Sequence, residues 1–375
     1  MGHLKYAKPK EIGIDGERLE TAYRLLRKWT TGPQAPVPGG AILVGRHGRV
    51  IPPRFFGRQG PEPNAEPIRE DGLFLLASIS KPITYLAGML QVERGQLNLS
   101  DHVARYIPDF AAHHKEETLV EHLFTHTSGM PDMLPNNAEL RKRHAPLKTF
   151  IAGAITSPPV FAPGTDHKYQ SMGTLVTAEL VQKLAGRPIR EVLRRELFEP
   201  LELEDIALGS RGLDRKRLVR VEVPEYQVGS DFGWNSRYWQ EFGAPWGGAF
   251  ASPEDLAVIC QLMLGDGEVR GTRVLAPATV RSMTENRLAT MPGIPPQLAA
   301  SRPWGLGWKL NHRGTSASWG DSLGPTVFGH TGATGTMCWM DRDRDAFCIL
   351  LTSAIRSRAP WRLVHLSNAV SAAIM

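Results

Sequence analysis

A serine and a lysine stand three residues apart in the segment Ser78-Ile79-Ser80-Lys81-Pro82. On a helix, this spacing turns both side chains to one face, about one turn apart. The proline is tolerated because its missing N–H would have no partner in a first helical turn. A lysine removed from water loses its proton more readily and can then activate a serine hydroxyl as a nucleophile. Such a pair also arises by chance, so the hypothesis of a nucleophile, Ser78, and its base, Lys81, needs support from elsewhere in the chain.

Two later segments carry side chains that could complete such a site. Tyr169-Gln170-Ser171 follows the turn Pro163-Gly164-Thr165 and places a tyrosine hydroxyl just before a predicted helix. Gly329-His330-Thr331-Gly332-Ala333 follows a short β-like run, where small residues let a substrate approach a strand edge closely. Taken alone, the tyrosine is more typical of a core residue and the histidine of a structural one, so only the three segments together indicate a site.

In this order, Ser-x-x-Lys, Tyr-x-Ser and His-Thr-Gly resemble the three signature elements of the penicillin-recognising serine hydrolases. The tyrosine variant is similar to the class C β-lactamases and the family VIII carboxylesterases. Further family-like stretches stand at residues 123–129, 247–256 and 305–308, so the resemblance covers nearly the whole chain. It implies a β-lactamase-like α+β fold, an antiparallel sheet flanked by N- and C-terminal helices with an inserted helical lobe, and no cofactor or metal.

Carried over residue by residue, the resemblance implies a role for each member of the site. Ser78 would be the acylated nucleophile and Lys81 its activating partner. Tyr169 would carry the proton between the nucleophile and the leaving group and would then help to activate water. The backbone N–H groups of Ser78 and Ala333 would form the oxyanion hole.

Two departures from the family pattern bear on the substrate. His330 stands where β-lactamases and peptidases have a lysine that helps to bind the substrate carboxylate, and Ser171 stands where they have an asparagine. A neutral histidine brings no fixed positive charge, and a serine hydroxyl cannot replace an amide's donor and acceptor pair. Thr331 and Gly332 complete the substrate-binding set that the resemblance implies. Because simple esters need neither lost contact, we expect a carboxylesterase that acts on small-molecule esters.

Other functions of the same fold stay open at this point. They are a β-lactamase, a D-amino-acid amidase or peptidase, and an acyltransferase that uses an alcohol in place of water. The non-enzymatic alternative is a scaffold or binding protein that kept the fold without activity. The retention of Ser78, Lys81 and Tyr169 together argues against it. The sequence does not choose among the enzymatic rivals.

Composition narrows the class of protein. The chain has 375 residues, of which 42% are hydrophobic and 22% charged, values typical of a folded globular protein. Its net charge of +6 raises nucleic acid or an anionic membrane as a partner, but the basic stretches are short and interrupted, so we expect neither. Without an apolar run long enough for a membrane helix or an export signal, we expect a cytoplasmic monomer or weak oligomer.

The three cysteines are too few for a disulfide framework, which favours a reducing compartment. Cys338 and Cys348 allow one exception. A hairpin centred on Asp343 would place these two residues opposite each other on neighbouring strands. The alternative, two buried free thiols, is the more usual state of such cysteines.

Periodicity predicts an α/β lobe from residues 1–80 and 246–375 and a helical insertion over residues 81–245, with the active serine at their seam. Asp15 and Ser252 read as N-caps of helices, and Gly95 and Gly186 as helix ends. The aromatic residues between 232 and 246 either line an acyl pocket or pack in the core. The helices expected within the insertion span 81–94, 119–124, 138–156, 172–185 and 189–198, and strands are expected at 327–328, 335–340 and 346–352.

Overall fold

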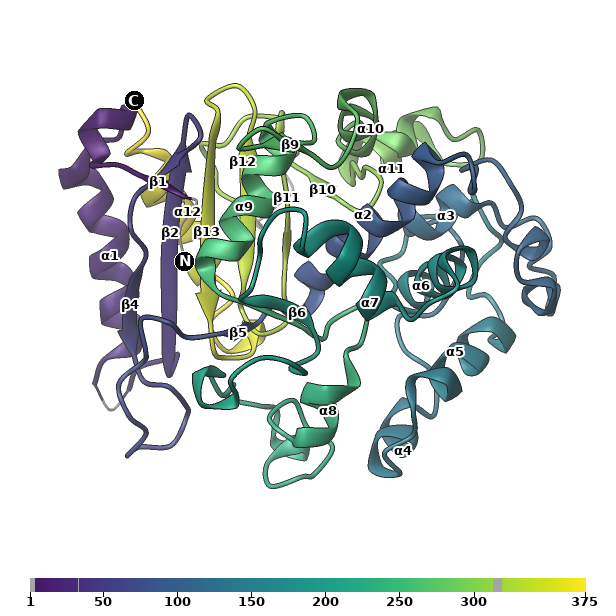
Figure 1. The fold of residues 1–375 in the computed structure, drawn as a ribbon, viewed down its shortest axis with the longest axis horizontal. Coiled ribbons are helices and arrows are strands. Elements are labelled where there is room, and N and C mark those ends of the chain that lie inside the picture. The colour runs from purple at the N-terminus through teal and green to yellow at the C-terminus, as the bar shows by residue number, and fades with distance from the viewer. Residues whose placement is uncertain (1–3, 33, 313–318) are drawn as a thin grey trace.

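The computed structural model describes residues 4–32, 34–312 and 319–375. Its main sheet has eight strands in the order β1-β3-β2-β13-β12-β11-β10, with β4 paired to β2. All pairs are antiparallel except β1 with β3. The two ends of the chain therefore meet in one sheet (Figure 1). The strands are β1 (Lys5–Tyr6), β2 (Gly39–Arg46), β3 (Arg49–Val50), β4 (Arg54–Gly57), β10 (Lys309–Leu310), β11 (Val327–Thr331), β12 (Met337–Asp341) and β13 (Ala346–Thr352).

Helices cover both faces of this sheet, as Figure 1 shows, with α1 and α12 on one side and α9 on the other. These helices are α1 (Gly16–Thr30), α12 (Arg362–Ser371) and α9 (Pro253–Leu264). The Asp15 carboxylate caps α1 and the Ser252 hydroxyl caps α9, as the sequence predicted. Because both faces are covered, β13 is buried along its whole length and its side chains alternate between two separate cores.

The strand register excludes the disulfide that the sequence left open. Cys338 pairs with Ile349, and Cys348 pairs with Trp339. The hairpin is centred between Asp343 and Arg344 and not on Asp343, so each residue of β12 pairs one position further along β13 than predicted. Because neighbouring residues of a strand point to opposite faces, this shift places the two cysteine side chains on opposite sides of the sheet. Cys338 lies in the core under α9, Cys348 lies in the core under α1 and α12, and both are free and buried.

Residues between β4 and α9 form most of the helical part of the molecule. The predicted helix over 138–156 is two helices, because the chain turns at His144 and Pro146 before α5 begins. Gly186 ends α6 in a left-handed conformation, as predicted. The helices here are α2 (Ser80–Glu93), α3 (Val120–Phe124), α4 (Asn137–Lys142), α5 (Leu147–Thr156), α6 (Met172–Ala185), α7 (Ile189–Leu193) and α8 (Arg237–Phe242).

A small sheet joins this helical part to the rest. Its order is β5-β7-β6, from strands β5 (Phe74–Leu75), β7 (Ala249–Ala251) and β6 (Ile206–Leu208), so the insertion also contributes one short strand. A separate hairpin of β8 (Glu268–Val269) and β9 (Thr272–Arg273) precedes α10 (Pro277–Met283) and α11 (Pro296–Ser301). Among the described residues, no helix combines the length and apolar character needed to cross a membrane.

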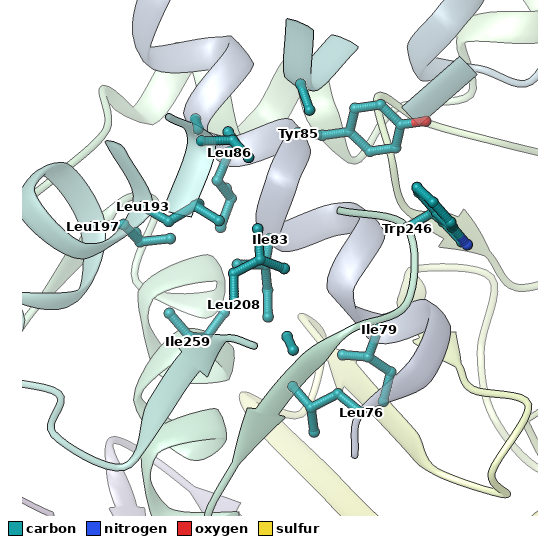
Figure 2. Close-up of a cluster of buried hydrophobic side chains, with 14 of the residues drawn as sticks. Leu76, Ile79, Ile83, Tyr85, Leu86, Leu193, Leu197, Leu208, Trp246 and Ile259 are labelled. Atoms are coloured by element: carbon teal, nitrogen blue, oxygen red, sulfur yellow. The ribbon is translucent and has the colours of Figure 1, made fainter. Parts of the chain in front are cut away.

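Helix α2 lies at the centre of the molecule and is buried on nearly all sides. Figure 2 shows Ile83 and Leu86 of α2 among leucine and isoleucine side chains from α7, β6 and α9. A helix that is apolar all round is typical of such a central position. The start of α2 is therefore held by packing from several directions, which matters because Ser78 and Lys81 lie there.

The cysteine geometry makes a direct prediction. Because Cys338 and Cys348 face different cores, neither can reach the other without refolding of the hairpin. Thiol titration of protein denatured without reductant should find three free thiols per chain. A disulfide between Cys338 and Cys348, found by peptide mapping of that sample, would contradict the strand register.

Candidate active site

Ser78 lies in a tight corner between strand β5 and helix α2. The corner is a single 3-10 turn, Ala77–Ile79, and Ala77 adopts a left-handed backbone with φ of 49°. This conformation is costly for a residue with a side chain, and it is typical of functional sites. The Ser80 hydroxyl fastens the corner, since it donates to the Ala77 carbonyl at 2.7 Å and accepts from the backbone N–H of Ala249 in β7 at 2.9 Å.

Lys81 reaches back along α2 to Ser78. Its ammonium nitrogen lies 3.2 Å from the Ser78 hydroxyl oxygen and donates to the Trp246 carbonyl at 2.9 Å. The side chain is 1% exposed, and this burial lowers the pKa of Lys81 to about 7, with the carboxylate of Asp132 acting in the opposite direction. A large fraction of the amine is therefore neutral at pH 7, the form that can accept a serine proton.

Tyr169 lies directly beside this pair. Its ring centroid is 4.7 Å from the Lys81 ammonium nitrogen. The hydroxyl is buried and has no hydrogen bond of ordinary geometry within the described part of the chain. Burial raises the pKa of Tyr169, and the nearby Ser78 hydroxyl offsets only part of that rise. The phenol thus keeps its proton in the resting enzyme and can pass it on only while another group replaces it.

The third predicted element, at the end of β11, is tied to the segment that leads to Ser78. Thr334 and Thr336 donate hydrogen bonds from their hydroxyls to the carbonyls of Leu75 and Leu76, at 2.9 Å and 2.8 Å. Gly332 sits so close to the Leu76 carbonyl that a Cβ there would collide with it. The structure therefore brings all three sequence elements together, and a glycine is required at their point of contact.

The backbone N–H groups of Ser78 and Ala333, expected to form an oxyanion hole, belong to the two segments that meet where Gly332 contacts Leu76. Neither the Ser78 nor the Ala333 amide donates to a carbonyl in the turns and loops of the described ranges. Ala333 is exposed, and its own carbonyl accepts a hydrogen bond of 2.7 Å from the backbone N–H of Arg356. These amides are available to a substrate oxygen, and their role as an oxyanion hole stays a prediction.

His330 is a buried, neutral histidine. Its Nδ1 lies 2.9 Å from the Thr331 carbonyl oxygen, an arrangement that places the ring proton on Nδ1. Burial and then the nearby Lys81 lower the pKa of His330 to about 3. The ring centroid is 6.0 Å from that of Tyr169. The histidine therefore supplies no positive charge to a substrate, as the sequence argument assumed.

The Ser171 hydroxyl is engaged by a nearby carboxylate. It donates to the carboxylate of Asp132 at 2.6 Å. Asp132 is exposed, and it acts electrostatically on both Lys81 and Tyr169. The sequence interpretation missed Asp132 because no local pattern marks it: it lies just after the family-like stretch at residues 123–129.

Two cations near the third element were also missed. Arg356 donates from its guanidinium to the Thr331 hydroxyl at 3.1 Å. Lys309 belongs to β10, where it pairs with Gly329, the residue before His330. Both act electrostatically on His330. Neither residue lies within one of the three motifs. Lys309 is brought to the site by strand pairing and Arg356 by the packing of a loop, so the sequence alone does not reveal them.

The aromatic residues between 232 and 246 are mainly core. Trp239, Phe242 and Trp246 are buried and pack against one another and against Phe150. Of the two readings that the sequence left open, packing in the core is the correct one for these three. Their contribution to the site is indirect, because they hold the Trp246 carbonyl against Lys81.

Residues 26–363 match the family model described as Beta-lactamase. The chain belongs to the β-lactamase family. Members of this family and fold are serine hydrolases, so the chain is a hydrolase by family as well as by the chemistry of its site. Within the described ranges, no group of three or more His, Cys, Asp or Glu residues is placed to hold a metal ion.

Individual relatives within the β-lactamase family are distant. A putative D-alanyl-D-alanine carboxypeptidase of Salmonella schwarzengrund is 23% identical over 90% of this chain and 83% of its own. A penicillin-binding protein homologue from Caulobacter crescentus has a TM-score of 0.76 at 19% identity, covering 96% of this chain and 99% of that one. A family VIII carboxylesterase has a TM-score of 0.73 at 17% identity, covering 94% and 96%. These likenesses establish the fold and leave the substrate open.

The pKa of Lys81 predicts the pH dependence of acylation. Since the neutral amine is the base, kcat/KM for an uncharged ester should rise by about tenfold per pH unit below pH 7 and level off above it. The substitution Asp132→Asn should move the midpoint to lower pH, because it removes the charge that raises the pKa of Lys81 while keeping an oxygen for Ser171.

A pH series of initial rates on both proteins measures this shift. Asp231→Asn is the matched control, since Asp231 is an exposed aspartate whose ion pair is with His144. The control should keep the midpoint of the wild type. A profile that still rises at pH 10, near the ordinary pKa of lysine, would contradict the assignment of Lys81.

Proposed function

We propose that this chain hydrolyses carboxylic esters through an acyl intermediate on Ser78. The observation that carries the proposal is the 3.2 Å contact between the Ser78 hydroxyl and the buried Lys81 amine, whose pKa is about 7. An amine that is neutral at working pH and in hydrogen-bond contact with a serine is the arrangement that nucleophilic acyl transfer needs.

The proposed acylation follows from the positions of four groups. Lys81 accepts the proton of Ser78 as the serine oxygen attacks the ester carbonyl carbon. The backbone N–H groups of Ser78 and Ala333 donate to the oxygen that becomes negative. Tyr169 gives its proton to the leaving oxygen as the acyl carbon–oxygen bond breaks, and it regains a proton from Lys81. The products are an acyl-serine and an alcohol, and the serine proton has in effect moved to the alcohol.

Deacylation repeats these steps with water as the nucleophile. Tyr169 and Lys81 take a proton from water, its oxygen attacks the acyl carbon, and Ser78 leaves with that proton. One ester and one water molecule then give one acid and one alcohol. The buried Tyr169 hydroxyl supports this role, because the Ser78 hydroxyl is the one described group whose hydrogen bonding affects its pKa.

Two contacts favour esters over β-lactams and peptides. The Ser171 hydroxyl is engaged by Asp132 and is not free to bind an amide side chain. His330 is neutral and cannot pair with a carboxylate at its position. The fold-level likeness to a family VIII carboxylesterase is consistent with this choice.

One observation favours a second candidate, hydrolysis of a β-lactam or a D-amino-acid peptide. The guanidinium of Arg356 lies against the Thr331 hydroxyl and provides a fixed charge next to the position where other members carry their lysine. The distant relative named as a putative D-alanyl-D-alanine carboxypeptidase is in line with this candidate.

The nucleophile is tested with Ser78→Ala. We expect p-nitrophenyl butyrate hydrolysis to fall by at least about a thousandfold, because the acyl-serine can no longer form. Ser100→Ala, a change at an exposed serine, should leave the rate unchanged. A fluorophosphonate probe followed by mass spectrometry should label the peptide that contains Ser78 in wild-type protein. Equal rates for wild type and Ser78→Ala, or no adduct on Ser78, would leave the scaffold as the better account.

The two candidate functions are separated by a chromogenic cephalosporin. We expect its kcat/KM to be lower than that of p-nitrophenyl butyrate by about a hundredfold or more, a typical penalty when a site lacks the partners for a substrate's polar groups. Both rates are measured on the same preparation at pH 8, where Lys81 is mostly neutral. A cephalosporin rate equal to or above the ester rate would favour the second candidate.

A further inference from the structure

Three buried rings with polar edges lie beside Tyr169, and none of them takes part in the proposed acylation. They belong to His126, in the family-like stretch at residues 123–129, to His167, two residues before Tyr169, and to Trp304, after α11. The ring centroid of His126 lies 4.7 Å from that of Tyr169, and the centroid of Trp304 lies 6.0 Å from it. The three rings form a triangle with centroid separations of 4.8, 5.3 and 6.2 Å. We call these three residues the ring cluster.

All five ring nitrogens of the ring cluster are buried and have no hydrogen bond to a described residue. His126 is fully buried, and His167 and Trp304 are each only 5% exposed. Leaving one buried donor or acceptor without a partner is costly, and native structures seldom repeat that cost five times in one place. These nitrogens therefore indicate bound molecules that supply the missing partners.

The backbone places His126 in the ring cluster in a strained conformation. Its φ of 60° lies in the left-handed region, which is uncommon for a residue with a side chain. The His126 carbonyl accepts the backbone N–H of Lys168 at 3.1 Å, and the Thr127 carbonyl accepts that of Gly164 at 2.8 Å. These hydrogen bonds fasten the strained loop to the segment that carries Tyr169. Backbone strain is typical of functional sites, which favours a role for this ring beyond packing.

Water is the molecule that fits the ring cluster. Two hydrogen bonds of about 2.9 Å let one water join groups up to about 5.8 Å apart, close to the separations of the rings. Burial is the main cause that lowers the pKa of His126 well below its ordinary value and the pKa of His167 to about 4. Each ring is therefore neutral and offers water one donor and one acceptor. The described ranges bring no third His, Cys, Asp or Glu to these two histidines for a metal ion.

The ring cluster lies between a pocket and the catalytic groups. His167, Tyr169 and Trp304 all line a pocket of about 580 Å³, whereas the fully buried His126 is not among its lining residues. On the inner side, Lys81 acts electrostatically on His126, so this ring is close to the proposed base. Water bound by the ring cluster would thus stand between the pocket and the buried hydroxyl of Tyr169.

We propose that the ring cluster binds water and that the water held between His126 and Tyr169 is the nucleophile of deacylation. This inference rests on the proposed acyl intermediate on Ser78 and adds the source of the water that hydrolyses it. The water gives one proton to the pair of Tyr169 and Lys81 as its oxygen bonds to the acyl carbon. The bond from that carbon to Ser78 then breaks, the serine oxygen takes the proton, and the acid leaves. His126 is a positioning residue in this step, because it orients the water and does not touch the acyl group.

The first test replaces the His126 ring by one without nitrogens. In His126→Phe, kcat for p-nitrophenyl butyrate should fall by at least about tenfold, because the water is no longer held in place. KM should fall in proportion, so that kcat/KM, which reports acylation, changes by less than about twofold. Rapid mixing should show a burst of p-nitrophenol close to one per chain, and mass spectrometry should find the butyryl group on Ser78. A merely structural role would lower kcat/KM together with kcat, and that result would overturn the proposal.

Three further variants separate water binding from packing. His126→Asn should recover much of kcat, since the amide offers a donor and an acceptor and asparagine tolerates a left-handed backbone. Trp304→Phe removes the indole N–H but keeps an aromatic ring, and it should lower kcat in the same selective way. Trp308→Phe is the matched control, because the indole N–H of Trp308 is also buried and unpartnered within the described chain, while its ring packs on Phe328. Equal effects of Trp304→Phe and Trp308→Phe would contradict the proposal. If His126→Phe does not fold, Trp304→Phe gives the same reading.

A structural measurement keeps this inference separate from the proposed function. A crystal structure of the Ser78→Ala protein should show an ordered water within about 3.2 Å of both a His126 ring nitrogen and the Tyr169 hydroxyl oxygen. The double variant Ser78→Ala, His126→Phe should lack this water. If no ester is turned over, the esterase proposal fails, and the crystal structure decides the water site by itself. A Ser78→Ala structure with no water beside His126 would overturn the inference even if esters are hydrolysed.

Discussion

The burial of one lysine amine against a serine hydroxyl is the constraint on which the rest of the structure depends. Lys81 can lose its proton near neutral pH only because α2 is surrounded by apolar side chains and water is kept from its first turn. The Trp246 carbonyl, positioned by the aromatic side chains around it, accepts a hydrogen bond from the amine. Because a carbonyl is uncharged, it stabilises the protonated amine less than a carboxylate would. The core around α2 thus serves catalysis as well as stability, since loosening it would return the amine to its ordinary, protonated state.

A second layer of polar contacts positions the strand opposite this pair. Arg362 is buried, and no carboxylate among the described residues pairs with it. It donates to backbone carbonyls, including that of Ala354 at 2.7 Å, and to the Thr352 hydroxyl. Thr352 in turn donates to the Gly335 carbonyl at 2.8 Å, in the turn that follows Ala333. Thr334 and Thr336 fix the other side of that turn to the segment before Ser78. These four groups, one guanidinium and three hydroxyls, hold a turn that carries no catalytic side chain of its own. They are needed because backbone N–H groups must be positioned by their neighbours.

The net charge of the chain does not show how charges are distributed around the site. The net charge of +6 indicates little, since many arginines are paired with surface acids. Around Tyr169, however, Asp132 stands on one side with Ser171, while Lys309 and Arg356 lie beside His330. Of these charges, Asp132 raises the pKa of Lys81, the base in the proposed mechanism. A family VIII carboxylesterase shares the fold, and a protein named as a putative D-alanyl-D-alanine carboxypeptidase is a distant sequence relative, so likeness by itself does not decide the substrate.

By itself, the sequence indicated the family and most of the elements. Ser78 and Lys81 are linked by helical spacing, α6 and β13 have the predicted bounds, and Asp15 and Ser252 cap their helices, because these features depend on neighbours a few residues apart. The tertiary structure alone decided the register that separates Cys338 from Cys348. Moving the centre of a hairpin by half a residue changes the register by one residue, which turns a side chain to the other face of the sheet relative to its partner strand. It also decided which charges meet the motifs. Asp132, Lys309 and Arg356 come from a loop, a neighbouring strand and a distant turn, and no local pattern encodes a contact that exists only after the chain has folded.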